Sequence, residues 1–219
     1  NVHLAGKAEM EAACEAAVNA QNDWIALGLE GRCQVFERCA DLLAGDWRMR
    51  GNASTMLNQS KTAFQAEIDS ACELIDFWRF NCHYARGFHD ELQPLVSPTG
   101  VKNSTEIRPL EGFVLSITPF NFTSIAANLP SAPAIVGCTS IWKPSRNSYH
   151  SNYVLMQLMM EAGLPAGVIN FLPGSGASIT EVALSNPDFA GLHFTGSTAT
   201  FQGLWQEISK ALPSLRSYP

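Results

Sequence analysis

The sequence has no run of lysine and arginine residues and no long hydrophobic run. Its formal net charge is −6 and its pI is about 5.3. An acidic chain without a basic cluster lacks the charges that attract nucleic acid or an anionic membrane surface, so we expect neither as a partner. A membrane-spanning helix needs roughly 18 uninterrupted apolar residues. No stretch of the sequence provides them, so we also expect no membrane span.

Targeting signals are missing from the amino end as well. The chain begins at Asn1 without an initiator methionine, a signal-peptide pattern or an arginine-rich transit peptide. We expect it to be an internal piece of a longer protein. Hydrophobic residues make up 46% and charged residues 16% of the 219 residues. This composition predicts a sizeable folded core rather than disorder.

No two of the six cysteines form a Cys-x-x-Cys pair. A chain of this length with a hydrophobic core does not need disulfide bonds, so we interpret the cysteines as reduced thiols in a reducing compartment. Cys82, His83 and His89 lie close in sequence, but their spacing matches no common zinc pattern. We predict no metal site. The six cysteines are Cys14, Cys33, Cys39, Cys72, Cys82 and Cys138.

The first 100 residues have the composition of helices, rich in Ala, Glu and Gln. Glu30-Gly31 is expected to separate the first two helices, and a polar stretch that includes Gly51–Ser54 follows the second helix. A capping-box spacing between Thr62 and Gln65 predicts the start of a long helix. The expected helices cover 8–27, 32–44 and a long segment from residue 62 that gives way to a loop over 87–100.

From Gly112 onward, short apolar strands alternate with helices, which predicts an α/β fold with a parallel sheet. Pro130 and Pro133 are expected to bend or interrupt the first of these helices. The expected strands cover 112–116, 139–143, 168–172 and 190–194, and the helices cover 124–137, 149–162, 177–184 and 198–212. We therefore divide the chain into a helical part (1–100), an extended segment (101–111) and a nucleotide-fold-like part (112–219).

The turn after the first strand carries Asn121. The carboxyl ends of parallel strands meet at one edge of the sheet, and ligands bind there in open α/β folds. The Asn121 amide offers two donors and no charge, so it can stabilise an oxyanion without titrating. The alternative is that Asn121 only caps the following helix or tightens the turn.

The other three turns carry residues suited to a dinucleotide. Lys143, at the end of the second strand, can donate hydrogen bonds to ribose hydroxyls, although it can equally be a solvated surface lysine. Gly196 and Ser197 open a helix whose free N–H groups and dipole favour a phosphate. The third turn contains Gly174-Ser175-Gly176 but lacks the third glycine of the usual dinucleotide fingerprint.

Four motifs, in order and spacing, resemble the aldehyde dehydrogenase superfamily. They are Ile117-Thr118-Pro119-Phe120-Asn121-Phe122, Trp142-Lys143-Pro144-Ser145, Glu161-Ala162-Gly163-Leu164-Pro165 with Val168-Ile169-Asn170, and Phe194-Thr195-Gly196-Ser197. The segment from Phe64 to Asn81 is similar to one branch, the Δ1-pyrroline-5-carboxylate (glutamate-γ-semialdehyde) dehydrogenases. The resemblance implies an incomplete aldehyde dehydrogenase fold, with an N-terminal helical segment followed by a Rossmann-like parallel sheet with flanking helices.

The resemblance also implies roles for individual residues. Asn121 matches the oxyanion-stabilising asparagine of the family, and Glu73 and Phe122 match residues beside the substrate pocket. The implied NAD contacts are Thr118, Lys143, Ser145, Gly196, Ser197, Thr198, Ala199 and Thr200. The implied reaction is attack of a cysteine thiolate on the semialdehyde, hydride transfer to NAD and hydrolysis of the thioester to glutamate, a step of proline catabolism.

The family's general-base glutamate and nucleophilic cysteine motifs do not occur in the sequence. We therefore expect this chain to be the amino-terminal and cofactor-binding fragment of the enzyme, inactive by itself. The alternative is a truncated, non-catalytic relative that serves as a structural or interaction subunit. The resemblance further implies a homo-oligomer, a dimer or larger, with Ser104–Leu110 near an oligomerisation sheet, unless other chains cover the exposed edge. It also implies the mitochondrial matrix.

Overall fold

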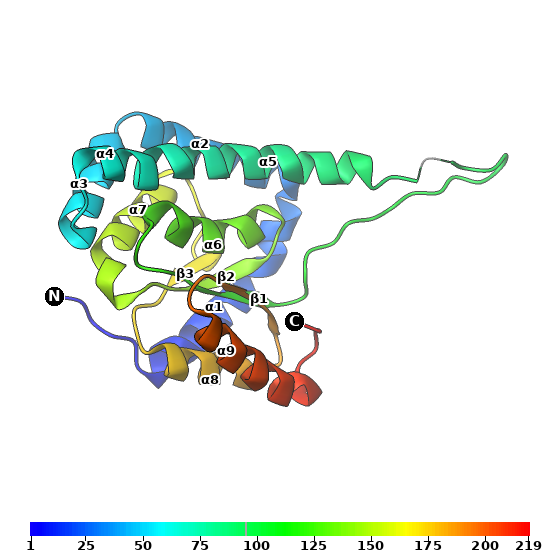
Figure 1. Cartoon of the computed structure of the whole chain (residues 1–219). Helices are drawn as coiled ribbons and strands as arrows, with labels where there is room; N and C mark the ends of the chain where they lie inside the picture. The colour runs from blue at the N-terminus through cyan, green and yellow to red at the C-terminus, as the bar shows by residue number, and fades with distance from the viewer. Residues whose placement is uncertain (95) are drawn as a thin grey trace.

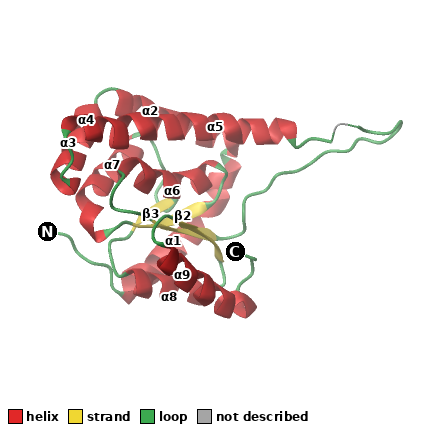
Figure 2. Ribbon diagram, in the orientation of Figure 1, coloured by secondary structure: helices red, strands yellow, loops and turns green. Residues whose placement is uncertain are grey.

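The computed structural model describes residues 1–94 and 96–219, and over these residues it places one parallel sheet between two layers of helices (Figures 1 and 2). Within the described residues the sheet has four strands in the order β3-β2-β1-β4, and every pairing is parallel. The strands are β1 (Phe113–Ile117), β2 (Thr139–Lys143), β3 (Ile169–Phe171) and β4 (Phe189–Phe194). The predicted α/β class and all four predicted strands are confirmed.

The strand register brings the four predicted turns to one edge. Ile117 at the end of β1 is the partner of Lys143 at the end of β2 and of Phe194 at the end of β4. Trp142 of β2 is the partner of Phe171, which ends β3. The loops that follow these strands therefore start side by side, as parallel strands require.

Helices cover both faces of the sheet, and each face has its own hydrophobic core (Figure 1). One core joins most of α1 and all of α8 to β1, and the other joins the end of α1 with α2, α5, α6 and α7 to β2 and β3. The helices are α1 (Lys7–Ala26), α2 (Gly28–Ala44), α3 (Arg48–Gln59), α4 (Ala63–Ala66), α5 (Glu73–Glu91), α6 (Thr123–Ile135), α7 (Tyr149–Glu161), α8 (Gly176–Ser185) and α9 (Thr198–Ala211), with a π-helical turn at Glu67–Cys72 and short 3₁₀ turns at Arg146–Ser148 and Leu212–Ser214.

Three buried tryptophans anchor the larger core, and each indole N–H has a hydrogen-bond acceptor. Trp24 donates to the Ala134 carbonyl at 2.8 Å and Trp78 to Ser131 Oγ at 2.9 Å. Trp142 donates to Thr118 Oγ1 at 3.1 Å. Satisfied indoles let these large side chains be buried without leaving a polar group unpaired.

The boundary between the first two helices differs from the prediction. The sequence predicts a break at Glu30-Gly31, but α2 begins at Gly28 and contains both residues. Gly28 has a φ of 74°, which only glycine adopts without strain, so the chain turns there. The break lies at Gly28, before Glu30-Gly31, because the required backbone conformation, not the helix propensity, sets it.

The polar stretch Gly51–Ser54, which none of the expected helices covers, lies inside α3. Tertiary contacts compensate for its weak helix propensity. A Cβ on Gly51 would lie 3.2 Å from the Leu43 side chain, so α3 packs closely on α2. Ser54 Oγ donates to the Gly51 carbonyl at 2.8 Å, inside the helix itself.

The long helix after Thr62 begins as predicted, with Thr62 and Gln65 forming a capping box. It differs in two respects. The π-helical turn Glu67–Cys72 interrupts it, and α5 continues past the predicted end at Gly87 to Glu91.

The two prolines of α6 do not interrupt it; the helix runs from Thr123 to Ile135. Pro133 lacks the N–H that would bond the Leu129 carbonyl four residues earlier. Ser116 Oγ donates to this carbonyl at 3.2 Å, and His193 Nδ1 lies 2.8 Å from it. Neighbouring strands thus take the place of the missing helix hydrogen bond.

The described residues between α5 and β1, 92–94 and 96–112, project from the body as an arm (Figure 1). Gln93 and Thr105 tie its two sides together, with the Gln93 amide donating to the Thr105 carbonyl and accepting from the Thr105 N–H, both at 3.1 Å. Ser104–Leu110 forms no strand with the described residues of this chain. Its role in an oligomerisation sheet stays a prediction, as does the division at residues 100 and 111.

Candidate cofactor cleft and active-site loop

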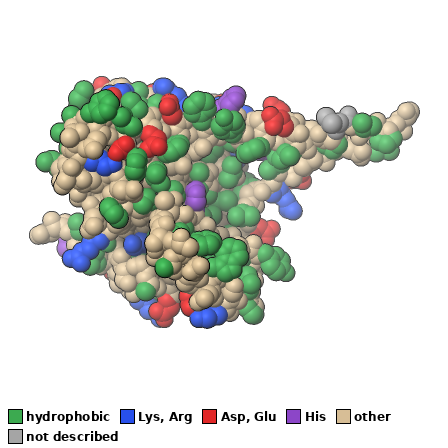
Figure 3. Space-filling model, in the orientation of Figure 1, with side chains coloured by type: hydrophobic (Ala, Val, Ile, Leu, Met, Phe, Trp, Pro, Cys, Tyr) green, Lys and Arg blue, Asp and Glu red, His purple; other side chains and the backbone are tan. Residues whose placement is uncertain are grey.

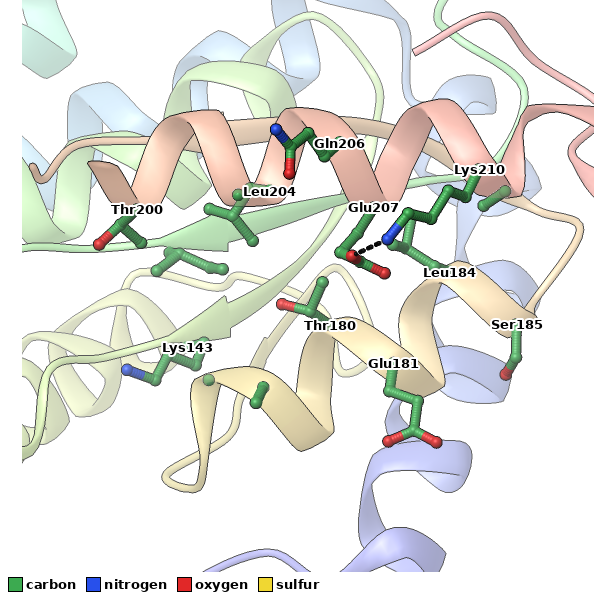
Figure 4. A pocket seen from close by; sticks show the side chains of 15 residues that line it. Lys143, Thr180, Glu181, Leu184, Ser185, Thr200, Leu204, Gln206, Glu207 and Lys210 are labelled. Atoms are coloured by element: carbon green, nitrogen blue, oxygen red, sulfur yellow. Dashed lines mark hydrogen bonds and ion pairs between the residues drawn. The ribbon is translucent and has the colours of Figure 1, made fainter. Parts of the chain in front are cut away.

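A cleft of about 850 Å³ lies at the carboxyl edge of the sheet between α8 and α9 (Figure 4). The two helices form its walls, and the ends of β1 and β2 close one end. Its lining residues are Ile117, Lys143, Gly176, Ala177, Thr180, Glu181, Leu184, Ser185, Thr200, Gly203, Leu204, Gln206, Glu207, Lys210 and Ala211. This is the edge at which α/β folds bind their ligands.

Lys143 stands at the strand end of this cleft, partly buried. Its Nζ lies 3.8 Å from the position of a Cβ on Gly176, the first residue of α8. Burial lowers the pKa of the Lys143 ammonium. Its ammonium is therefore partly desolvated and suited to donate to a polar ligand in the cleft.

Two serines cap the helices that wall the cleft. Ser197 Oγ accepts from the Thr200 N–H at 3.2 Å, and Ser175 Oγ accepts from the Ser178 N–H at 3.5 Å. Each cap satisfies one of the first-turn N–H groups and leaves others for a ligand. The N-terminus of α9, where Thr200 lines the cleft, therefore combines free donors with the positive end of the helix dipole.

Thr180 presents an unsatisfied polar group in the wall formed by α8. Thr180 is 8% exposed, and its Oγ1 has no hydrogen-bond partner among the described residues. A buried hydroxyl without a partner costs free energy. Since Thr180 also lines the cleft, a ligand with a donor or acceptor at this depth would satisfy it. The cleft thus fits a group that is both polar and partly apolar, as a dinucleotide is.

Asn121 lies outside this cleft, in a second pocket of about 600 Å³ next to the same edge. Phe122 is the N-cap residue of α6, and no side chain caps the helix there. Asn121 is exposed, and among the residues that the structure describes none hydrogen-bonds its side chain. The interpretation of Asn121 as a helix cap is therefore wrong, and its amide donors are available. The pocket is lined by Asn58, Gln59, Ser60, Lys61, Phe120, Asn121, Phe122 and Asn147.

The loop that carries Asn121 is anchored at both ends. Before it, Thr118 is 4% exposed and its N–H donates to the Lys143 carbonyl at 3.1 Å. After it, Ser124 Oγ donates to the Glu73 carboxylate, which comes from the start of α5. Glu73 is thereby held beside the first turn of α6.

The structure brings together only some of the predicted site residues. Lys143 and Thr200 line the cleft, and Asn121 and Phe122 line the second pocket. Neither pocket is lined by the other predicted site residues, which are Thr118, Ser145, Gly196, Ser197, Thr198, Ala199 and Glu73. Their predicted contacts stay predictions.

The walls of the cleft were missed. No sequence prediction named Thr180 or Leu184 of α8, or Leu204 and Glu207 of α9, although all four line it. Their spacing along each helix indicates a shared face. Nothing in the spacing indicates that this face borders a cleft rather than the core.

The model of the aldehyde dehydrogenase family matches residues 1–216. The chain belongs to the aldehyde dehydrogenase family. Among curated relatives, the Δ1-pyrroline-5-carboxylate dehydrogenase of Agaricus bisporus is 45% identical over 210 residues, which cover 96% of this chain and 38% of that protein. The mitochondrial enzyme of Emericella nidulans is 46% identical over 213 residues, 96% of this chain and 37% of that protein.

Solved structures of aldehyde dehydrogenase relatives have the same fold. The Δ-pyrroline-5-carboxylate dehydrogenase of Mycobacterium tuberculosis is 54% identical with a TM-score of 0.97, over 100% of this chain and 40% of that one. A second structure of that enzyme, described as bound with NAD, also has a TM-score of 0.97. The chain therefore spans about two fifths of the length of the relatives that it matches. The predicted family and its fold are confirmed.

Proposed function

We propose that the whole protein is an NAD-dependent Δ1-pyrroline-5-carboxylate dehydrogenase, which oxidises glutamate-γ-semialdehyde to glutamate in proline catabolism, and that this chain is its cofactor-binding portion. The observation that carries the proposal is the pairing of Ile117 with Lys143 in the sheet. This register starts the Asn121 loop and the Lys143 turn side by side, so an oxyanion donor and a dinucleotide donor share one edge. The 54% identity with the Mycobacterium enzyme along the whole chain supports the branch.

In this proposal NAD, when bound, supplies the acceptor for the hydride of the aldehyde. Lys143 donates to its ribose hydroxyls, and the N-terminus of α9 near Ser197 and Thr200 receives a phosphate. The orphaned hydroxyl of Thr180 gains a partner in the cleft. Thr118, Ser145, Gly196, Thr198 and Ala199 remain the other proposed contacts.

Asn121 donates its amide N–H to the oxygen of the aldehyde as negative charge develops on it. Its exposed position in the second pocket leaves this donor free for a substrate. Glu73 and Phe122 are proposed to border the same substrate. We propose that the nucleophilic thiolate and the general base come from other parts of the whole protein.

The positions of the six cysteines support that assignment. Five of them are buried. For Cys14, burial raises the thiol pKa to about 11, which disfavours the thiolate form. Cys72 is partly buried, and its Sγ lies 3.4 Å from Arg48 Nη2. Among the described residues that line the pocket of Asn121 there is no cysteine.

The test is turnover by the complete protein. Purified full-length protein is assayed for NAD reduction with glutamate-γ-semialdehyde and with unrelated aliphatic aldehydes, with NADP as the matched control cofactor. A preference for the semialdehyde and for NAD in kcat/KM is expected. Equal turnover of unrelated aldehydes would refute the substrate assignment, and no reduction of either cofactor would leave a non-catalytic subunit as the better interpretation.

We also propose a homo-oligomer, and the mitochondrial matrix where the host is a eukaryote. Several eukaryotic relatives carry the word mitochondrial in their names. Helix α9 contributes no buried residue and exposes Trp205 by 63%, and Figure 3 shows hydrophobic side chains gathered on the face over α9. Light scattering of wild-type protein and of Trp205→Glu tests the oligomer, and cell fractionation tests the location.

A further inference from the structure

The three residues that follow Asn121 are each held by a side chain from the helical part of the chain. Thr123 Oγ1 lies 2.8 Å from Thr55 Oγ1 and accepts from Gln59 Nε2 at 2.7 Å. Ser124 Oγ donates to the Glu73 carboxylate. The ring of Phe122, the residue directly after Asn121, lies 4.3 Å from the ammonium nitrogen of Lys61.

Lys61 is itself fixed in place. Its ammonium forms an ion pair with Asp69, and the two side chains are only 14% and 15% exposed. A cation held over an aromatic face in a partly desolvated site attracts the ring more strongly than one at an exposed site. The ion pair therefore does not only join two segments of the chain; it also holds a cation against Phe122.

The backbone before Lys61 adopts a costly conformation to place it there. Ser60 has a φ of 54°, and among the described residues it is the only one other than glycine with a positive φ. A left-handed conformation is strained for a serine and persists where surrounding contacts enforce it. Ser60 ends α3 and turns the chain so that Lys61 faces Phe122.

The π-helical turn supplies the opposite side of this arrangement. It contains Asp69 and ends at Cys72, directly before Glu73. One stretch of helix therefore places two carboxylates near the start of α6. Asp69 forms the ion pair with Lys61, whose ammonium contacts Phe122, and Glu73 accepts the hydrogen bond from Ser124. Such irregular turns recur at functional sites because they rotate the side chains that follow them.

We propose that Lys61, held by Asp69, is a positioning residue that fixes the Phe122 ring and with it the direction of the Asn121 amide. The inference rests on the proposed function, since it gives Asn121 its role. Asn121 sits on an exposed loop whose side chain makes no hydrogen bond to the described residues, so its direction depends on the residue next to it. A misplacement of about 1 Å at a reacting centre costs on the order of 10²-fold in rate.

The first measurement needs no substrate. Amide hydrogen exchange is followed in the full-length protein for Lys61→Met, Lys61→Arg and Arg79→Met. Arg79 of α5 is the matched control because it forms an exposed ion pair with Asp41 of α2. Lys61→Met is expected to speed exchange in the peptide spanning residues 118–126 and to leave the peptides of α9 unchanged, whereas Lys61→Arg restores protection and Arg79→Met changes neither.

The second measurement separates positioning from binding. Lys61→Met is expected to lower kcat for the semialdehyde by on the order of 10²-fold, with the Kd for NAD unchanged and the rate largely recovered in Lys61→Arg. Asp69→Asn is expected to give a similar loss, and the double variant no further loss, because both changes release the same ring.

Two results would overturn the inference. One is unchanged exchange over residues 118–126 in Lys61→Met; the other is a rise in exchange spread over the whole chain, which would make Lys61 a general stabilising residue. If wild-type protein failed to oxidise the semialdehyde while the local exchange changed as expected, the proposed function would fail and the positioning contact would stand.

Discussion

Lys143 of β2 and Gly176 of α8 lie together at the strand end of the cleft, with Lys143 Nζ 3.8 Å from the position of a Cβ on Gly176. Both residues line the cleft, so a ligand bound there would lie beside the Lys143 ammonium. Burial also lowers the pKa of Lys143. An anionic ligand in the cleft would therefore change the pKa of Lys143.

We predict that NAD affinity falls as the pH rises through the depressed pKa of Lys143. An anionic dinucleotide favours the ammonium and raises its pKa, so binding takes up a proton in that window. Since the folded state binds this proton less tightly than the unfolded state, stability without NAD should rise with pH over the same window. Calorimetric Kd values from neutral to alkaline pH test this, with Lys143→Met as the control that flattens the profile.

Asn121→Ala should lower kcat for the semialdehyde by about 10²–10³-fold, the usual cost of removing one oxyanion donor. The melting temperature should not change, because the side chain is exposed and makes no hydrogen bond to the described residues. Asn121→Asp is a matched variant of nearly equal size that places a negative charge where the oxyanion forms. It should be at least as inactive, and an active Asn121→Asp enzyme would contradict the role.

Thr180→Val should have opposite effects on the free and the NAD-bound protein. Without a ligand it removes a buried hydroxyl that has no partner, so the free energy of unfolding should stay equal or rise. With NAD it removes a hydrogen bond of about 0.5–1.5 kcal/mol and should raise the Kd roughly 2- to 12-fold. Thr180→Ser keeps the hydroxyl and serves as the control. Unchanged NAD affinity in Thr180→Val would show that no ligand group reaches it.

Gly112→Ala should prevent stable folding of the β1 end of the sheet. Gly112 has a φ of 117°, and a Cβ there would lie 1.9 Å from the Asp188 carbonyl oxygen. Gly87→Ala is the matched control inside α5, where the nearest atom to a Cβ is Glu91 Oε1 at 3.8 Å. It should stabilise the protein by about 0.5–1 kcal/mol. Chemical denaturation of both variants makes the comparison.

Arg32→Met should lower the free energy of unfolding by about 1–3 kcal/mol, the cost of leaving buried acceptors unpaired. Arg32 is 5% exposed and donates to the carbonyls of Ile135 at 3.0 Å and Ile25 at 3.3 Å, near the ends of α6 and α1. Arg79→Met, which breaks an exposed pair, should cost less than about 1 kcal/mol. Equal losses in the two variants would refute the role of Arg32 at the helix ends.

Local patterns in the sequence were sufficient for the fold. Alternating apolar strands and helices predicted β1 to β4, and the parallel pairing then required Asn121 and Lys143 to start loops at one edge. The Thr62–Gln65 capping box marked a helix start correctly because a cap depends on residues three apart. These features need only short-range chemistry, which a sequence records directly.

Contacts between distant segments decided the rest. The polar stretch at Gly51 became helical because it packs on Leu43, and α6 ran through Pro133 because Ser116 and His193 occupy the carbonyl that the proline leaves free.

The same is true of the sites. Thr180 borders a cleft, and Lys61 meets Phe122, only because helices far apart in the chain lie together. The sequence by itself determined the four strands, most of the helices and the edge at which a ligand site is expected, since these follow from periodicity and strand polarity. Only the tertiary structure decided which side chains surround that ligand, because such neighbours are set by packing across the chain.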